Sequence, residues 1–312
     1  MALFGSKQQQ PGRVAVNFAA RGARFAQVEC RAANKPKVMR CEFQLLPLAD
    51  AAALGKLRKE YKLGGYACSH LLRAGEYKLL LVDAPEVPAA ELKTALRWKV
   101  KDLLDYPVEQ ATIDALAVPV SKDSASRSRS VYAVAAPNDT IRERMAAFDG
   151  AGFRLDAIDV PELAQRNIAA LYEHDERGVA MLSFGPEGEG GLLTFTAGGA
   201  LYLARRIDIG AWQLQDANED IRKQHLERLV LELQRSLDYF DRQFHAIPLS
   251  RLLLAPFVGA AELRDYLVHN LYVGVERLNL NEAFDFSAVP DLVDNAETQA
   301  DFLPLLGAAL RV

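Results

Sequence analysis

Hydrophobic and polar residues alternate along the first 45 residues with the period of β-strands. One alternating run covers 14–18, a break of small residues follows at 19–22, and a second run covers 25–28. Because successive side chains of a strand point to opposite faces, this spacing predicts a strand, a tight turn and a second strand. A third strand is expected at 39–45, so the chain should open as a β-meander.

Helices and strands then alternate up to residue 175. The helix that starts at Pro88 repeats its apolar positions every 3.6 residues, and the helix at 137–150 should turn Ile141, Met145 and Phe148 inward. The polar segment 121–130 is expected to be a hairpin connection, with a regulatory phosphosite cluster as the alternative. The remaining predictions in this part are strands at 77–85, 111–120, 131–136 and 153–160 and helices at 51–61 and 161–172.

The second half repeats the opening pattern. A strand, a glycine-rich turn at 185–191, a strand, a Gly198–Gly199 turn and a third strand are expected between 179 and 210. A meander that heads each half indicates an internal repeat, and two repeated lobes predict a cleft between them. The other predictions are helices at 226–244, 261–270 and 302–311, strands at 251–254 and 273–278, and an acidic surface stretch at 282–301.

Composition excludes several classes of protein. Half of the 312 residues are hydrophobic and a quarter are charged, as in a folded globular chain of two cores. A net charge of −4 without a basic stripe argues against nucleic acid as a partner. The longest apolar run of the second half, 252–261, is too short to span a bilayer, and the N-terminus lacks the apolar region of a signal peptide. Any membrane contact is therefore expected to come through a partner.

No metal or catalytic constellation stands out. Cys30, Cys41 and Cys68 show neither zinc spacing nor a disulfide framework, which fits a reducing cytoplasm. Ser183 lacks the glycines of a nucleophile elbow. Trp98 is expected in the core, with a place in a binding groove as the alternative. The histidines, which are expected on the surface or at helix caps, are His70, His174, His225, His245 and His269.

Several strings of the sequence resemble the PilM family of type IV pilus assembly proteins. In 81–114 a strand runs through APEVP into AELKTALRWKVKDLLDYPVEQATIDA, which has the proline, helix, Arg-Trp, Tyr-Pro and Asp pattern of that family. Similar strings are LDAIDVPELAQ within 151–165, IDIG at 207–210 and GAALR at 307–311. The resemblance covers nearly the whole chain, and within the family it is greatest to the MshI branch, which serves the mannose-sensitive pilus.

The resemblance implies an α/β, actin-like (ribonuclease H-like) fold of two lobes, similar to the cell-division protein FtsA, with an inserted subdomain of the FtsA/PilM type. The expected division is a tail at 1–12, a first lobe at 13–175 and a second lobe at 176–312. The inserted subdomain is expected at about 78–130 of the first lobe, and the last helix is expected to return from the second lobe to the first.

The family's nucleotide site has two glycine-rich hairpins that surround phosphates with backbone N–H groups, and an acidic residue at each turn. In the first hairpin, the resemblance places Asn17 at the carboxylate, Ala19 at a glycine and Arg21 among small residues. An amide is a poorer ligand for Mg²⁺ than a carboxylate, and a Cβ obstructs a turn that a phosphate must approach.

The second hairpin departs further. Ser183 stands at the acidic position before Gly185, and Glu187 and Glu189 lie where a triphosphate should bind. These carboxylates would repel it. A third motif, for adenosine, aligns with 255–259. The vestigial nucleotide site is thus expected at Asn17, Ala19, Arg21, Arg24, Ser183, Gly185, Pro256 and Gly259. No working cofactor is expected, although weak binding of Mg-ATP without turnover stays open.

The resemblance further implies a cytoplasmic scaffold, a pseudo-ATPase peripheral to the inner membrane through its partners. A groove around 81–120 and the neighbouring strand at 132–135 would bind the cytoplasmic tail of a PilN-like inner-membrane protein. Pilus motor ATPases, platform proteins and self-association are further expected contacts. The candidate partner-binding residues are Arg97, Trp98, Tyr106, Pro107, Val118 and Tyr132.

Three rival functions stay open. The first is an active or ATP-binding PilM-type ATPase. The second is a cytoplasmic domain of a GspL-like type II secretion protein, which would need a transmembrane helix after the final GAALRV. The third is a sugar- or acetate-kinase-like enzyme, which is disfavoured because neither phosphate turn offers a catalytic Asp.

Overall fold

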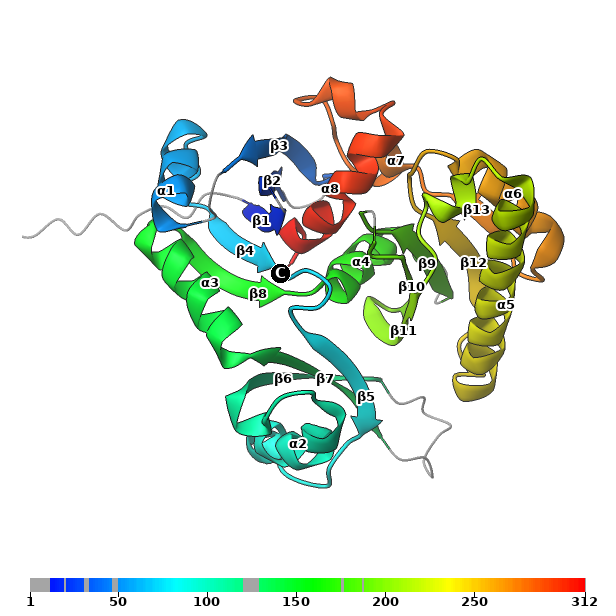
Figure 1. Cartoon of the computed structure of the whole chain (residues 1–312), viewed down its shortest axis with the longest axis horizontal. Helices are drawn as coiled ribbons and strands as arrows, with labels where there is room; N and C mark the ends of the chain where they lie inside the picture. Colours follow the sequence, from blue (N-terminus) through cyan, green and yellow to red (C-terminus); the bar gives the residue numbers. More distant parts are fainter. Residues whose placement is uncertain are drawn as a thin grey trace, which may run out of the picture.

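The computed structural model describes residues 12–19, 21–30, 34–46, 50–119, 129–174, 177–186 and 188–311. These residues form three β-sheets, two of five strands and one of three, with helices around them. Figure 1 shows two large lobes side by side and a small third unit that projects from the first lobe. The predicted tail up to residue 11, most of the 121–130 segment, Ala20 and Glu187 lie outside the described residues.

The first lobe contains a sheet in the order β3-β2-β1-β4-β8. β1 (Arg13–Ala19), β2 (Gly22–Glu29) and β3 (Lys37–Leu45) form the predicted antiparallel meander. β4 (Ala67–Leu71) lies parallel to β1, and β8 (Arg154–Asp159) lies parallel to β4. The sequence pattern did not reveal β4, because all five of its residues are buried and a strand buried on both faces shows no alternation.

The second lobe repeats this sheet, in the order β11-β10-β9-β12-β13. β9 (Gly178–Phe184), β10 (Gly191–Ala197) and β11 (Ala200–Ile207) form an antiparallel meander. β12 (Leu249–Leu254) and β13 (Val275–Arg277) follow as parallel strands. The two sheets share strand order and direction, so the internal repeat predicted from the two meanders is confirmed.

Each sheet carries helices on its outer face. In the first lobe these are α1 (Ala51–Glu60) and α3 (Asn138–Gly150), whose apolar side chains form one core with β1, β2 and β4. In the second lobe they are α5 (Glu219–Gln243) and α6 (Ala260–Asn270), which cover β9, β10 and β12. α5 begins two turns before the predicted start, because the side chain of its N-cap, Asn218, accepts hydrogen bonds from two backbone N–H groups of the first turn.

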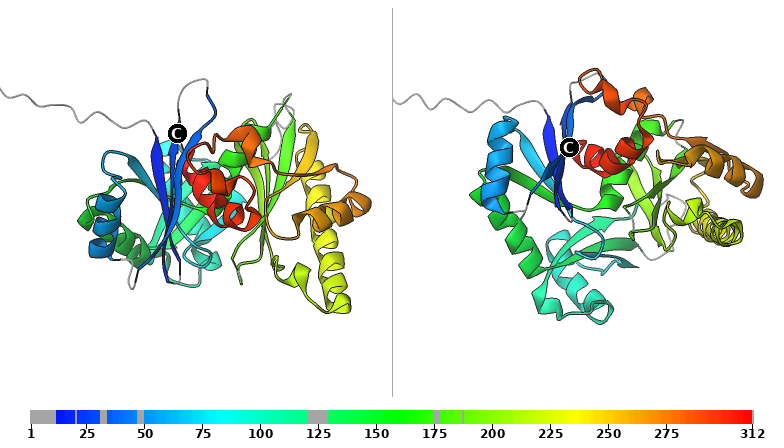
Figure 2. Two further views of the ribbon diagram at one scale, coloured as in Figure 1. Left: turned by 90° about the horizontal axis from the view of Figure 1, so that it is seen from above. Right: turned by 45° about the horizontal axis from the view of Figure 1, so that its top comes forward.

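Two helices lie between the sheets and contact each other (Figure 2). α4 (Pro161–Ala169), from the first lobe, lies on β9, β10 and β11 of the second. α8 (Ala296–Ala309), from the end of the chain, lies on β1, β2 and β4 of the first. Each lobe therefore supplies the inner helix of the other, and the apolar core between the sheets contains residues of both lobes.

The third unit is inserted between β4 and α3. Its sheet, β5-β7-β6, is antiparallel and consists of β5 (Lys78–Asp83), β6 (Ala111–Ala117) and β7 (Ser130–Pro137). α2 (Leu92–Val100) covers one face of this sheet and shares a small core with it. The short remaining helices are Ala89–Glu91, Lys101–Leu103, Val108–Gln110, Ala170–Tyr172, Gln213–Gln215, α7 (Leu280–Ala283) and Pro290–Leu292.

Two predictions about buried side chains were wrong. In α3 only Phe148 is buried, and Met145 is 54% exposed, so the neighbouring layer covers only part of the apolar face of this helix. The acidic stretch 282–301 is not simply surface, since Phe284 and Leu292 enter the core between the sheets. Among the described residues, no helix is both long enough and apolar enough to cross a bilayer.

Candidate functional site

The two β-hairpins that head the lobes face each other across a cavity of about 490 Å³. Turn residues of β1–β2 line one side and turn residues of β9–β10 line the other, and residues of α4 and α8 complete the lining. Six of the eight residues expected at the vestigial nucleotide site line this cleft, namely Asn17, Ala19, Arg21, Arg24, Ser183 and Gly185. They meet because the duplicated sheets present equivalent turns to the same gap.

The first hairpin presents an amide where a metal-binding carboxylate is needed. Asn17 lies opposite Arg24 in the antiparallel register of β1 and β2. The Oδ1 atom of Asn17 is buried and has no hydrogen-bond partner among the described residues. Arg24 is held by an ion pair to Asp301 of α8, with 3.1 Å between Nη2 and Oδ2. This side of the cleft is therefore cationic, with a neutral oxygen in its wall.

The second hairpin satisfies its polar groups internally. The hydroxyl of Ser183 donates a 2.5 Å hydrogen bond to Oε1 of Gln165 on α4. The Nε2 atom of Gln165 in turn donates to the carbonyl of Met181 at 2.8 Å and to Oγ1 of Thr194 at 3.0 Å. The N–H of Gly185 donates to the carbonyl oxygen of Gly190 at 2.9 Å. These donors are thus already engaged within the chain.

Glu189 lies over the glycine of this hairpin. A Cβ atom built on Gly185 would lie 2.8 Å from Cβ and 3.1 Å from Oε2 of Glu189, and Glu189 lines the cleft. Burial raises the pKa of the Glu189 carboxyl, and the nearby Arg206, Arg73 and Arg24 oppose that shift. A carboxylate thus occupies the space next to the turn that a phosphate would approach.

The third motif lies elsewhere. Pro256 and Gly259 line a second cavity, of about 650 Å³, at the carboxyl ends of β12 and β13. Phe184 lines the cleft and Phe257 lines the second cavity, and their buried rings meet edge to face with 4.9 Å between the centroids. The vestigial residues therefore form two cavities with an aromatic wall between them, and not the single site that the sequence predicted.

Mg-ATP fits this arrangement poorly. A nucleotide needs a continuous cleft for its base and phosphates, free N–H groups at the turns, and anionic oxygens for Mg²⁺. Here Phe184 and Phe257 interrupt the cleft, Glu189 adds negative charge beside the turn, and Asn17 contributes no charge. Among the described residues, no group of three or more His, Cys, Asp and Glu side chains is placed to hold a metal ion.

A solved structure of similar architecture identifies the fold. No family model and no curated protein matches the sequence. The chain is similar to a chain of a solved PilM–PilN type IV pilus biogenesis complex, with 21% identity, a TM-score of 0.71, and coverage of 98% of this chain and 99% of that one. The fold is a PilM-like, actin-like fold. The expected α/β actin-like architecture is thereby confirmed.

Two other solved structures are less similar. The cytoplasmic domain of EpsL, from the type II secretion system of Vibrio cholerae, shares 15% identity at a TM-score of 0.42, over 66% of this chain and 78% of that domain. A Bacteroides thetaiotaomicron protein with an actin-like ATPase fold and unknown function shares 10% identity at a TM-score of 0.49, over 95% of this chain and 99% of that one.

A polar network that the sequence did not reveal joins three parts of this PilM-like fold. Glu162 of α4 is 3% exposed and pairs with Arg206 of β11 at 2.8 Å. Tyr77, directly before β5, donates a 2.5 Å hydrogen bond to Glu162 and accepts one of 2.7 Å from Arg206. Nothing in the sequence distinguishes Glu162 from an ordinary acidic residue in a first helical turn. The network ties the inserted unit to both lobes.

The sequence predicted a surface or helix-cap position for His70, and this prediction was wrong. His70 is fully buried on β4, where Nδ1 donates to the carbonyl oxygen of Val16 at 3.1 Å. The ring packs against both Phe18 and Phe148, with centroid distances of 4.8 and 5.2 Å, and these two rings also contact each other. Desolvation, aided by the positive charge of Arg144, lowers the pKa of His70 to about 4.

Three of the expected partner-binding residues have internal partners. Arg97 donates from Nη1 to the carbonyl of Val108 at 2.8 Å and from Nη2 to the carbonyl of Ala111 at 3.1 Å. Val118 and Tyr132 are buried against Leu201 of β11. These three side chains fasten the inserted unit internally and to the second lobe. Val118 and Tyr132 are buried, and Arg97 is half-buried with its guanidinium bonded within its own unit.

The other three expected residues remain accessible. Trp98 is 74% exposed, so its expected place in the core was wrong, and Nζ of Lys101 lies 5.9 Å from its ring centroid. It points outward because the inner face of α2 is taken by Leu96 and Val100. Pro107 is exposed and Tyr106 is half-buried. The accessible candidate surface is therefore the outside of α2 and the segment that follows it.

Proposed function

We propose that this chain is a scaffold of type IV pilus assembly that binds the short cytoplasmic segment of a PilN-like inner-membrane protein. The observation that carries the proposal is the likeness to a chain of a PilM–PilN complex along 98% of this sequence. The family resemblance of the strings at 81–114 and 151–165 supports it. From the sequence resemblance alone we also propose the MshI branch. The likeness to the PilM–PilN complex supports a cytoplasmic position at the inner membrane, held through that partner.

The inserted unit offers the binding surface. β5 is an edge strand, and in the described part of the chain it pairs only with β7. Its Leu81 is exposed, as are Leu103 and Trp98 of the same unit. Lys78 at the start of β5 contacts the 103–105 segment through the carbonyl of Leu103 and the carboxylate of Asp105. An extended peptide can add to such an edge through backbone hydrogen bonds while its side chains contact the exposed apolar residues.

A synthetic peptide of the N-terminal cytoplasmic segment of the neighbouring PilN-like protein is expected to bind the purified chain in calorimetry. Trp98→Ala should weaken binding by about 2 kcal/mol, or roughly 30-fold, as for an exposed aromatic anchor. Trp212→Ala is the matched control, since Trp212 is 50% exposed on the second lobe, outside the inserted unit. Absence of binding by the unmodified chain would refute the proposal. Equal effects of Trp98→Ala and Trp212→Ala would refute the assignment of the binding surface to the inserted unit.

We also propose that the cleft no longer turns over ATP. The interrupted cleft, the uncharged Asn17 and the position of Glu189 support this. The competing function is an ATP-binding or active ATPase of the same fold.

Thermal unfolding with and without millimolar Mg-ATP distinguishes these functions. We expect no saturable rise in melting temperature, whereas a ligand at about 100 times its Kd would stabilise the chain by about 2.7 kcal/mol. Mg-ADP and Mg-GTP serve as controls for ionic effects. A saturable rise that is specific for ATP, or release of phosphate above background, would contradict the loss of nucleotide function.

A further inference from the structure

Arginines from both lobes converge on the cleft. Arg24 of β2 and Arg73, which follows β4, belong to the first lobe, and Arg206 of β11 belongs to the second. Among the described residues each pairs with one carboxylate: Asp301 at 3.1 Å, Glu76 at 3.2 Å and Glu162 at 2.8 Å, respectively. A guanidinium has five N–H donors, so one carboxylate leaves part of its capacity unused. The cleft therefore attracts anions.

Glu189 is the anion that faces these arginines. Its carboxylate lies over Gly185, inside the cleft, and is partly buried. The charges that act on it most strongly are, in order, Arg206, Arg73 and Arg24. Within the described residues Glu189 makes no ion pair shorter than 4 Å, so its attraction to the three arginines acts at longer range. Two of the three arginines belong to the opposite lobe.

We propose that Glu189 is an internal anion that occupies the phosphate position of the cleft and holds the two lobes together without a bound ligand. The carboxylate comes from the second lobe and attracts Arg24 and Arg73 of the first, so the attraction acts across the gap. The same charge repels any phosphate from the position. This inference rests on the proposed loss of nucleotide turnover. It adds that the Glu189 carboxylate takes the place of the nucleotide phosphate.

Inorganic pyrophosphate tests whether the cleft binds phosphate once the Glu189 carboxylate has been removed. Thermal unfolding with increasing pyrophosphate is expected to show no saturable stabilisation of the unmodified chain. For Glu189→Ala, which removes both the charge and the bulk, we expect binding tighter by on the order of tenfold or more. Glu189→Gln, which keeps the shape and removes the charge, should be intermediate. Glu143→Gln is the control, since it removes one exposed carboxylate from α3, away from the cleft.

Small-angle scattering gives a second readout. The radius of gyration of Glu189→Ala should exceed that of the unmodified chain, and pyrophosphate should reverse the increase. The inference is refuted if Glu189→Ala binds pyrophosphate no more tightly than the unmodified chain. It is also refuted if, without pyrophosphate, the radius of gyration of Glu189→Ala equals that of the unmodified chain. Binding of the PilN-like peptide is measured separately on the unmodified chain, so its failure would refute the proposed function alone.

Discussion

Gly307→Ala is expected to lower the free energy of unfolding by about 3 kcal/mol or more, because it forces apart the two helices between the sheets. A Cβ atom on Gly307 of α8 would lie 2.1 Å from the carbonyl oxygen and 2.6 Å from the carbonyl carbon of Ala164 on α4. Both contacts are to backbone, which cannot rotate away as a side chain can. Relief therefore requires the helices to separate.

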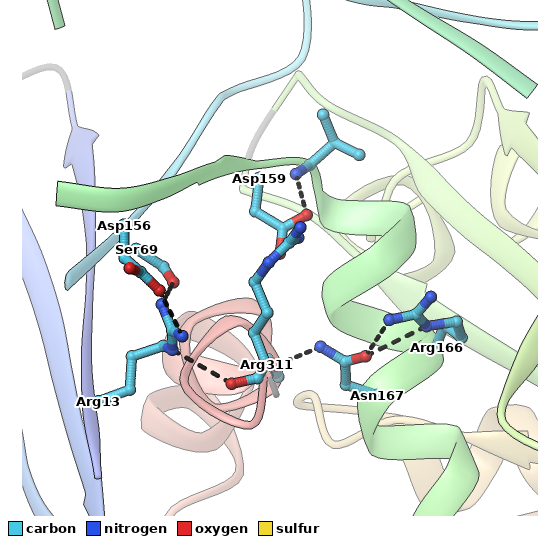
Figure 3. Close-up of polar contacts among 9 residues, drawn as sticks. Arg13, Ser69, Asp156, Asp159, Arg166, Asn167 and Arg311 are labelled. Carbon is cyan, nitrogen blue, oxygen red and sulfur yellow. Dashed lines mark hydrogen bonds and ion pairs between the residues drawn. The ribbon is translucent and has the colours of Figure 1, made fainter. Parts of the chain in front are cut away.

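Separation would also break polar contacts around the end of α8 (Figure 3). The carbonyl oxygen of Gly307 accepts a 2.9 Å hydrogen bond from Nδ2 of Asn167. Nη1 of Arg311 pairs with the buried Asp159 at 2.9 Å, and the carbonyl oxygen of Arg311 accepts from Nε of Arg13 at 3.2 Å. Because Asp159 is buried, loss of its ion pair with Arg311 would lower the free energy of unfolding of the variant further.

Chemical denaturation followed by circular dichroism measures this effect. The matched control is Gly274→Ala, because a Cβ at Gly274 meets nothing within 4 Å and the backbone there is not left-handed. That control should leave stability unchanged or slightly raised. If the two variants unfold at the same denaturant concentration, the close contact of α4 and α8 does not constrain the lobes as argued.

Acid is expected to destabilise the protein through His70. The folded-state pKa of about 4 lies below the ordinary value of 6.5, so between these values the unfolded chain binds a proton that the folded chain does not. The free energy of unfolding should therefore fall as the pH falls from 6.5 to 4, by about 3 kcal/mol in total from this group. The charged groups near the ring are Arg144, Arg73 and Glu76.

His70→Asn removes the titration, and the readout is the slope of unfolding free energy against pH. The variant starts from a lower stability, because the imidazole ring that packs against Phe18 and Phe148 is lost, yet it should lose less stability on acidification. His269→Asn, at an exposed position on α6, is the matched histidine substitution outside the core. Parallel pH profiles for all three proteins would show that His70 does not titrate as described.

Local periodicity accounts for what could be predicted of the fold. The two meanders and the helices with one apolar face were found because their buried positions recur every two or 3.6 residues. β4 was missed for the opposite reason, since full burial removes the polar half of the pattern. Met145 was misassigned because periodicity marks a face of a helix and does not say how much of that face the neighbouring layer covers.

The candidate sites depended more on tertiary structure. The resemblance assigned eight residues to one nucleotide site, yet Pro256 and Gly259 line a separate cavity, because Phe184 and Phe257 meet between the two. Arg97 carries the family pattern, but its guanidinium binds two carbonyl groups of its own unit. The direction of a side chain and the identity of its partner are set by residues far away along the chain.

The sequence by itself determined the duplicated α/β plan and the residues of both hairpin turns, since these follow from local periodicity and residue type. Only the tertiary structure decided which charges meet in the cleft. Glu189 and the two arginines Arg24 and Arg73 line the same cleft because the contact of α4 with α8 places the two hairpins opposite each other. Coulomb interactions depend on distances in space that the sequence does not contain.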